Sequence, residues 1–130
     1  MVSVSGNVHA GVEWAVRPYR EEDFEATVAL DNFVSQADGL GIVMTPEEQR
    51  VIFSRPGFHP ERRALVVEGP RLEGVADGML LGYATLPSVE DEETGERMYT
   101  ANLFLHPAAR EFGLPRVLMG RLVEIARKEE

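Results

Sequence analysis

The stretch from Leu103 to Ala126 constrains the fold more than any other part of the sequence. It consists of a short apolar segment, a polar turn and a run in which apolar residues recur at intervals of four, four and three residues. This spacing predicts an amphipathic helix with one apolar face, formed by Leu114, Leu118, Leu122 and Ile125. Such a face needs an apolar surface to pack on, and the apolar segment directly upstream predicts that this surface is a β-sheet.

The rest of the chain contains both helical and strand patterns. Three acidic residues at 21–23 favour the start of a helix, and Thr45, Pro46 and Glu48 form a capping box with proline at the first helical position. Beyond residue 60 the pattern changes to apolar runs bounded by Gly and Pro, which is typical of strands. The predicted elements are a strand at 14–17, helices at 21–36 and 45–54, strands at 64–68, 79–86 and 98–105, and a helix at 114–126.

This order predicts a mixed α/β domain of the α+β type, with a mainly antiparallel sheet of four strands and helices on its faces. Residues 1–12 are small and polar, so we expect them to form a flexible lead-in and residues 13–130 to form the domain. We expect Trp14 and Phe33 in the core and His106 exposed at the end of the last strand. A length of 130 residues with 44% hydrophobic content suffices for one buried core.

The composition argues against several classes of function. The chain has no cysteine, which excludes disulfides, thiolate zinc sites and a cysteine nucleophile. Its three histidines, at positions 9, 59 and 106, lack the spacing of metal ligands, so no metal site is expected. A formal net charge of −9 disfavours a nucleic-acid partner, and it suits either a cationic substrate or a solvated surface. No membrane span or signal peptide is evident, so we expect no membrane partner and a cytoplasmic location.

The strand–turn–helix segment resembles a known motif. Leu105-His-Pro107, Arg110-Glu-Phe-Gly113-Leu-Pro115 and Leu118 follow one another in the sequence. They are similar to the acyl-CoA-binding motif of the GNAT superfamily of N-acetyltransferases, in which V-x-P precedes [Q/R]-x-x-G-x-[G/A] and a helix. The resemblance implies a GNAT-like fold and acetyl-CoA as cosubstrate. The residues implied in cofactor binding are Leu103, Phe104, Leu105, Arg110, Glu111, Phe112, Gly113, Leu114 and Pro115.

In this family the backbone of the strand pairs with the pantetheine arm, and N–H groups at the helix start surround the pyrophosphate. The sequence departs from the motif at Pro115, where the family has Gly or Ala and where proline provides no N–H. It also ends where the family continues with further strands. We therefore expect an incomplete GNAT-like domain, completed either by a second copy in a homodimer or by a downstream domain.

The resemblance implies acyl transfer from acetyl-CoA to an amine acceptor, which could be a small molecule or a peptide. The sequence does not identify the catalytic base or acid. Tyr99, Asn102 and Glu68 are candidates because they lie on or beside the predicted strands, and each also fits a surface or packing role. Two functions remain open. The chain is either part of an N-acetyltransferase or a degenerate GNAT-like module that binds no CoA and serves as a scaffold, dimerisation or regulatory domain.

Overall fold

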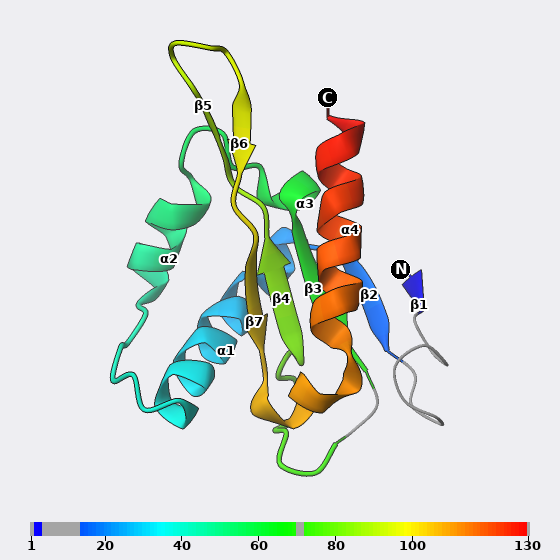
Figure 1. Ribbon diagram of the computed structural model, residues 1–130. Coiled ribbons are helices and arrows are strands. Elements are labelled where there is room, and N and C mark those ends of the chain that lie inside the picture. Colours follow the sequence, from blue (N-terminus) through cyan, green and yellow to red (C-terminus); the bar gives the residue numbers. More distant parts are fainter. Residues whose placement is uncertain (1, 4–13, 70–71, 130) are drawn as a thin grey trace.

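The computed structural model describes residues 2–3, 14–69 and 72–129, and all statements below concern these residues. An antiparallel sheet runs through the molecule in the strand order β1-β2-β3-β4-β7, with helices on both faces (Figure 1). Its strands are β1 (Val2–Ser3), β2 (Ala15–Pro18), β3 (Ala64–Glu68), β4 (Gly82–Thr85) and β7 (Asn102–Leu105). A separate two-stranded hairpin is formed by β5 (Ser88–Glu90) and β6 (Arg97–Tyr99).

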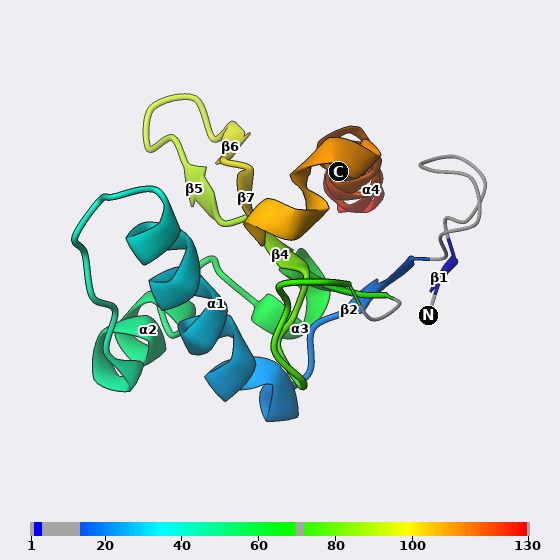
Figure 2. The same ribbon diagram turned by 90° about the horizontal axis from the view of Figure 1, so that it is seen from below.

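The helices divide between the two faces of the sheet. Helices α1 (Phe24–Ala37) and α2 (Pro46–Phe53) lie on one side, and α4 (Leu114–Lys128) lies on the other (Figure 2). A short helix α3 (Pro60–Arg63) leads directly into β3, and two short 3-10 helices, η1 (Glu21–Asp23) and η2 (Pro107–Phe112), precede α1 and α4. None of the helices in this described part of the chain is long and apolar enough to cross a membrane.

Strand β3 shows how alternation along the sequence builds two cores. Leu65 and Val67 face α4 and pack in a cluster with Trp14 and the α4 leucines. Their neighbours Ala64 and Val66 face α1 and α2 and pack with phenylalanines of the second cluster. Because successive side chains of a strand point to opposite faces, an uninterrupted apolar run is what a strand covered on both sides requires.

The predicted packing of the last helix is confirmed. Leu114, Leu118 and Leu122 are at most 1% exposed and belong to the cluster on the α4 face of the sheet. Ile125 is partly buried against the same cluster. The three leucines anchor α4, and with it the turn that precedes the helix, to the sheet.

The entry into α1 is fixed by a buried ion pair. The Arg17 guanidinium donates two hydrogen bonds of 2.8 Å to the Asp23 carboxylate, which also accepts one from the Arg20 backbone N–H. Glu68 at the end of β3 accepts from the same guanidinium at 3.1 and 3.2 Å. This arrangement joins β2, β3 and the start of α1, and it lowers the pKa of Asp23, chiefly through the bonds from Arg17.

Several predicted details were wrong. The sheet has a fifth strand, because Val2–Ser3 pairs with β2. The predicted strand at 98–105 is two strands, since the chain leaves the β5–β6 hairpin at Thr100, whose N–H donates to the Pro87 carbonyl, before β7 pairs with β4. The strand predicted from residue 79 begins only at Gly82. A Cβ at Gly82 would lie 2.6 Å from Leu105 Cδ2, so the absence of a side chain lets β4 and β7 approach.

Candidate functional site

The turn between β7 and α4 is built by local hydrogen bonds and one glycine. His106 Nδ1 accepts from the Ala108 N–H at 3.1 Å and caps the start of η2. Gly113 then adopts a φ of 73°, in the left-handed region that favours glycine, and α4 begins at the next residue. Pro115 lies in the first turn of α4, where a missing N–H breaks no helical bond, and it is exposed. Leu114 and Arg116 keep N–H groups that the helix itself does not use.

His106 is not exposed as predicted. It is 2% exposed, and its ring stacks on Phe33 of α1 with centroids 4.5 Å apart. Burial lowers the pKa of His106, and the nearby Arg110 charge lowers it further. Phe33 in turn has 36% of its surface exposed, so the prediction that it lies in the core was wrong. The stack joins the turn after β7 to α1.

Arg110 makes a second link between this turn and α1. Its guanidinium forms a two-pronged ion pair with Asp38, at 2.9 and 3.0 Å, and its Nε donates to the Leu105 carbonyl at 3.3 Å. Both side chains of the pair are more than a third exposed, so solvent screens the pair and it contributes little to stability. The bond lowers the pKa of Asp38 and raises that of Arg110.

The remaining residues implied in cofactor binding belong to β7 and η2. Leu103, Phe104 and Leu105 belong to β7, which ends the strand order and pairs only with β4 among the described strands. Its other backbone edge is therefore available to an extended ligand. Glu111 and Phe112 belong to η2, and their side chains lie outside the described part of the structure.

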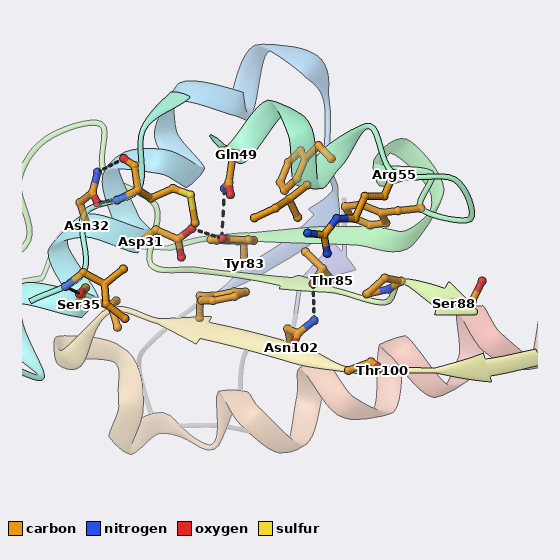
Figure 3. Close-up of a pocket in the computed structure, with 18 of the residues that line it drawn as sticks. Asp31, Asn32, Ser35, Gln49, Arg55, Tyr83, Thr85, Ser88, Thr100 and Asn102 are labelled. Atoms are coloured by element: carbon orange, nitrogen blue, oxygen red, sulfur yellow. Dashed lines mark hydrogen bonds between the residues drawn. The ribbon is translucent and has the colours of Figure 1, made fainter. Parts of the chain in front are cut away.

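A cavity of about 600 Å³ opens between β7 and the helices α1 and α2, on the face of the sheet that these helices cover (Figure 3). Its volume lies within the range of pockets that enclose small-molecule ligands. Strands β4 and β7 form one wall through Tyr83, Thr85, Asn102 and Phe104, and the rings of Tyr83 and Phe104 stack at 4.4 Å. The other walls come from α1, the loop after it, α2 and the start of the β5–β6 hairpin.

The Asp31 carboxylate is one of the polar groups that line this cavity. Tyr83 donates a hydrogen bond of 2.8 Å to Asp31 Oδ2, and Gln49 lies 3.4 Å from the Tyr83 hydroxyl (Figure 3). Burial raises the pKa of Asp31, and the bond from Tyr83 opposes this effect. A half-buried carboxylate with a raised pKa in a cavity is a candidate acid or base.

The loop between α1 and α2 forms an apolar rim over the cavity. Leu40 and Ile42 line the cavity and are about 60% exposed. Asn32 holds the loop through two bonds with the Met44 backbone, at 2.6 and 2.9 Å, and Ser35 Oγ accepts from the Ile42 N–H. The rim is thus tied to the helix that carries Asp31.

The three candidate catalytic residues from the sequence are not brought together. Asn102 lines the cavity and donates to Thr85 Oγ1 at 3.2 Å. Tyr99 packs against the cluster on the α4 side of the sheet, and Glu68 is bonded to Arg17 away from the cavity. Asp31 was not predicted from the sequence, although Thr27, Asp31 and Ser35 recur at intervals of four residues and mark a polar stripe on α1.

The overall fold is that of GNAT N-acetyltransferases. The chain matches a GCN5-related N-acetyltransferase from Sphaerobacter thermophilus with a TM-score of 0.66 at 20% identity, over 89% of this chain and 33% of that one. It matches an N-acetyltransferase from Staphylococcus aureus Mu50 with a TM-score of 0.61 at 22% identity, over 88% of this chain and 67% of that one. It also matches yncA from Salmonella typhimurium, a putative acetyltransferase solved with its cofactor acetyl-CoA, with a TM-score of 0.61 at 19% identity, over 88% of this chain and 64% of that one. The chain therefore spans between one third and two thirds of their lengths. By sequence, neither a protein-family profile nor a curated protein matches it.

Proposed function

We propose that this chain carries the acyl-CoA site and the acceptor cavity of a GNAT-type N-acyltransferase, which transfers the acetyl group of acetyl-CoA to an amine. One observation supports this most. The open edge of β7 leads at one end to the start of α4, and the cavity that holds Asp31 opens beside the same strand. A thioester laid along β7 would therefore lie next to a cavity that contains a carboxylate.

The residues present fit acetyl-CoA. The backbone of Leu103, Phe104 and Leu105 can pair with the amides of the pantetheine arm. Gly113 and the N–H groups of Leu114 and Arg116 can receive the pyrophosphate at the positive end of the α4 dipole. Pro115 removes one donor, which at roughly 1.5–3 kcal/mol for a charge-assisted bond lowers the affinity without abolishing the site.

The Arg110–Asp38 pair also bears on the choice between enzyme and degenerate module. An arginine held by a carboxylate is not free for a phosphate, which favours a module without CoA. However, this pair is exposed and therefore weak. A phosphate accepts the same two parallel bonds and carries more negative charge than a carboxylate, so a phosphate can displace Asp38. The balance favours the enzyme.

Asp31 is the proposed proton acceptor. Its carboxylate receives a proton from the ammonium R–NH3+, which leaves the neutral amine R–NH2 and a carboxylic acid. As the amine nitrogen bonds to the thioester carbon, the C–S bond breaks, and the departing thiolate takes the second proton from nitrogen. The products are an amide and the free thiol of CoA, and Asp31 returns its proton to water. The raised pKa of Asp31 suits it to this cycle.

The activity can be measured as release of CoA thiol, because a chain without cysteine gives no background with a thiol reagent. We expect thiol release from acetyl-CoA to depend on added amine and to fall at least a hundredfold in Asp31→Asn. Glu124→Gln, on an exposed position of α4, is the control and should keep full activity. No amine-dependent release, together with no binding of acetyl-CoA, would favour the scaffold function.

A further inference from the structure

Two opposite charges face the same cavity. Asp31 on α1 and Arg55, just beyond the end of α2, are the only charged residues among the described residues that line it. Figure 3 shows the Arg55 guanidinium pointing into the cavity, on the other side of Tyr83 from Asp31. The two groups come from separate elements and are not paired with each other.

Among the described residues, Arg55 is the one arginine that lines the cavity, and no carboxylate holds it there. The side chains of Arg17, Arg20, Arg50, Arg63, Arg97 and Arg110 each have a carboxylate within 4.0 Å. Arg55 has no such partner among the described residues, although the chain carries nine more acidic than basic groups. Asp31 likewise has hydrogen bonds but no cation beside it.

Apolar side chains line much of the same cavity. Ile52, Phe53 and Phe104 line the cavity, and the neighbouring polar groups, Thr85 and Asn102, bond to each other. Asp31 is partly buried beside these side chains and loses hydration, and a ligand cation restores the lost interaction. Arg55 is exposed, and from the lining of the cavity its guanidinium can reach a ligand carboxylate. A ligand with an ammonium group alone would satisfy Asp31 and leave Arg55 without a partner.

We propose that the cavity takes an amino carboxylate with an apolar body, whose ammonium group is bound by Asp31 and whose carboxylate is bound by Arg55. Arginine suits the second role because its planar fork binds a carboxylate through two parallel bonds. The apolar body lies against Phe53 and Phe104. This inference rests on the proposed function, since it names the class of the acceptor, and it is tested by binding without acetyl-CoA.

The test is a calorimetric titration of the chain with four probes. L-Leucine and 6-aminohexanoate carry both charges at different spacings, 3-methylbutylamine lacks the carboxylate, and 4-methylpentanoate lacks the amine. We expect the better amino carboxylate to bind at least tenfold more tightly than either single-charge probe. The ratio of the affinities for leucine and 6-aminohexanoate reports which spacing between the two charges the cavity prefers.

Two variants separate the two ends of the site. Arg55→Gln should lower the affinity for the amino carboxylate at least tenfold and change the affinity for 3-methylbutylamine less than twofold. Asp31→Asn should lower the affinity for both compounds. Arg127→Gln removes an exposed charge at the end of α4, remote from the cavity, and should change neither. Arg55 is exposed and its side chain bonds to no other side chain in the described part of the protein. Its replacement should therefore leave the fold intact, which circular dichroism can verify.

Failure of this inference can be distinguished from failure of the proposed function. If 3-methylbutylamine binds as tightly as the amino carboxylates, or if Arg55→Gln weakens both equally, the carboxylate site is wrong while the acyltransferase stands. If no amino carboxylate binds at millimolar concentration, the inference is also overturned. If an amino carboxylate binds as predicted but acetyl-CoA does not, the proposed function is wrong and the binding site stands.

Discussion

Replacing Tyr83 by phenylalanine tests the geometry of the cavity directly. The substitution removes the hydroxyl that donates a 2.8 Å hydrogen bond to the Asp31 carboxylate and keeps the ring, which is 2% exposed and stacked on Phe104. Hydrogen bonds to charged groups contribute about 1.5–3 kcal/mol. We expect Tyr83→Phe to lower the free energy of unfolding by about that amount at pH 7.5.

Tyr19 provides a matched control. It is 4% exposed and its ring packs edge-on against Phe53, but its hydroxyl is buried without a hydrogen-bond partner among the described residues. Burial raises the pKa of Tyr19 to about 12, so its hydroxyl stays protonated. Tyr19→Phe removes a buried group that makes no bond, and it should leave the stability unchanged or raise it.

Urea unfolding measures both effects through one signal. Trp14 is the only tryptophan and is 1% exposed, so its fluorescence reports loss of the core. With a urea dependence of about 2 kcal/mol per molar, Tyr83→Phe should lower the midpoint by about 1 M. Equal effects of the two substitutions, or a coupling energy between Tyr83→Phe and Asp31→Asn below about 0.5 kcal/mol, would refute the Tyr83–Asp31 bond.

Three further predictions follow from named contacts. Because burial raises the pKa of Asp31, the folded state binds this proton more tightly than the unfolded state, and the associated stability is lost as the pH rises through the raised pKa. Asp31→Asn should therefore be more stable than the parent at pH 8, with the difference disappearing near pH 3, and a pH-independent difference in urea unfolding would contradict this. Asp38→Asn frees Arg110 and should raise the affinity for acetyl-CoA up to about fivefold in calorimetry. An unchanged affinity would show that Arg110 makes no phosphate contact. Leu118→Ala in the α4 face should cost about 3–5 kcal/mol of unfolding free energy, against less than about 1 kcal/mol for Met119→Ala, which is 40% exposed.

Much of the fold was predictable because its signals are local. The α4 leucines recur at helical spacing, and β3 begins and ends where the apolar run does. The left-handed turn before α4 needs a glycine, and Gly113 provides it. Each of these features depends on residues that are neighbours in the sequence.

The cavity was not predictable, because it depends on contacts between distant segments. The polar stripe with Asp31 lies on the face of α1 that meets β4, whereas the apolar spacing had placed Phe33 in the core. Arg55 follows the end of α2, and no sequence pattern around it indicates that it lines a cavity. His106 is stacked against Phe33, which lies some seventy residues earlier in the chain. The predicted partner at the β7 edge, a second copy or a downstream domain, stays a prediction.

Titration of the 15N-labelled chain with acetyl-CoA tests the central claim most directly. The proposed function predicts saturable amide shifts along β7, at Leu103 to Leu105, and at the start of α4, at Gly113, Leu114 and Arg116. Desulfo-CoA, which keeps the pyrophosphate, should shift the same α4 amides, whereas adenosine alone should not. Amides that stay unshifted at millimolar acetyl-CoA, or shifts confined to other elements, would contradict the acyl-CoA site and with it the acyltransferase.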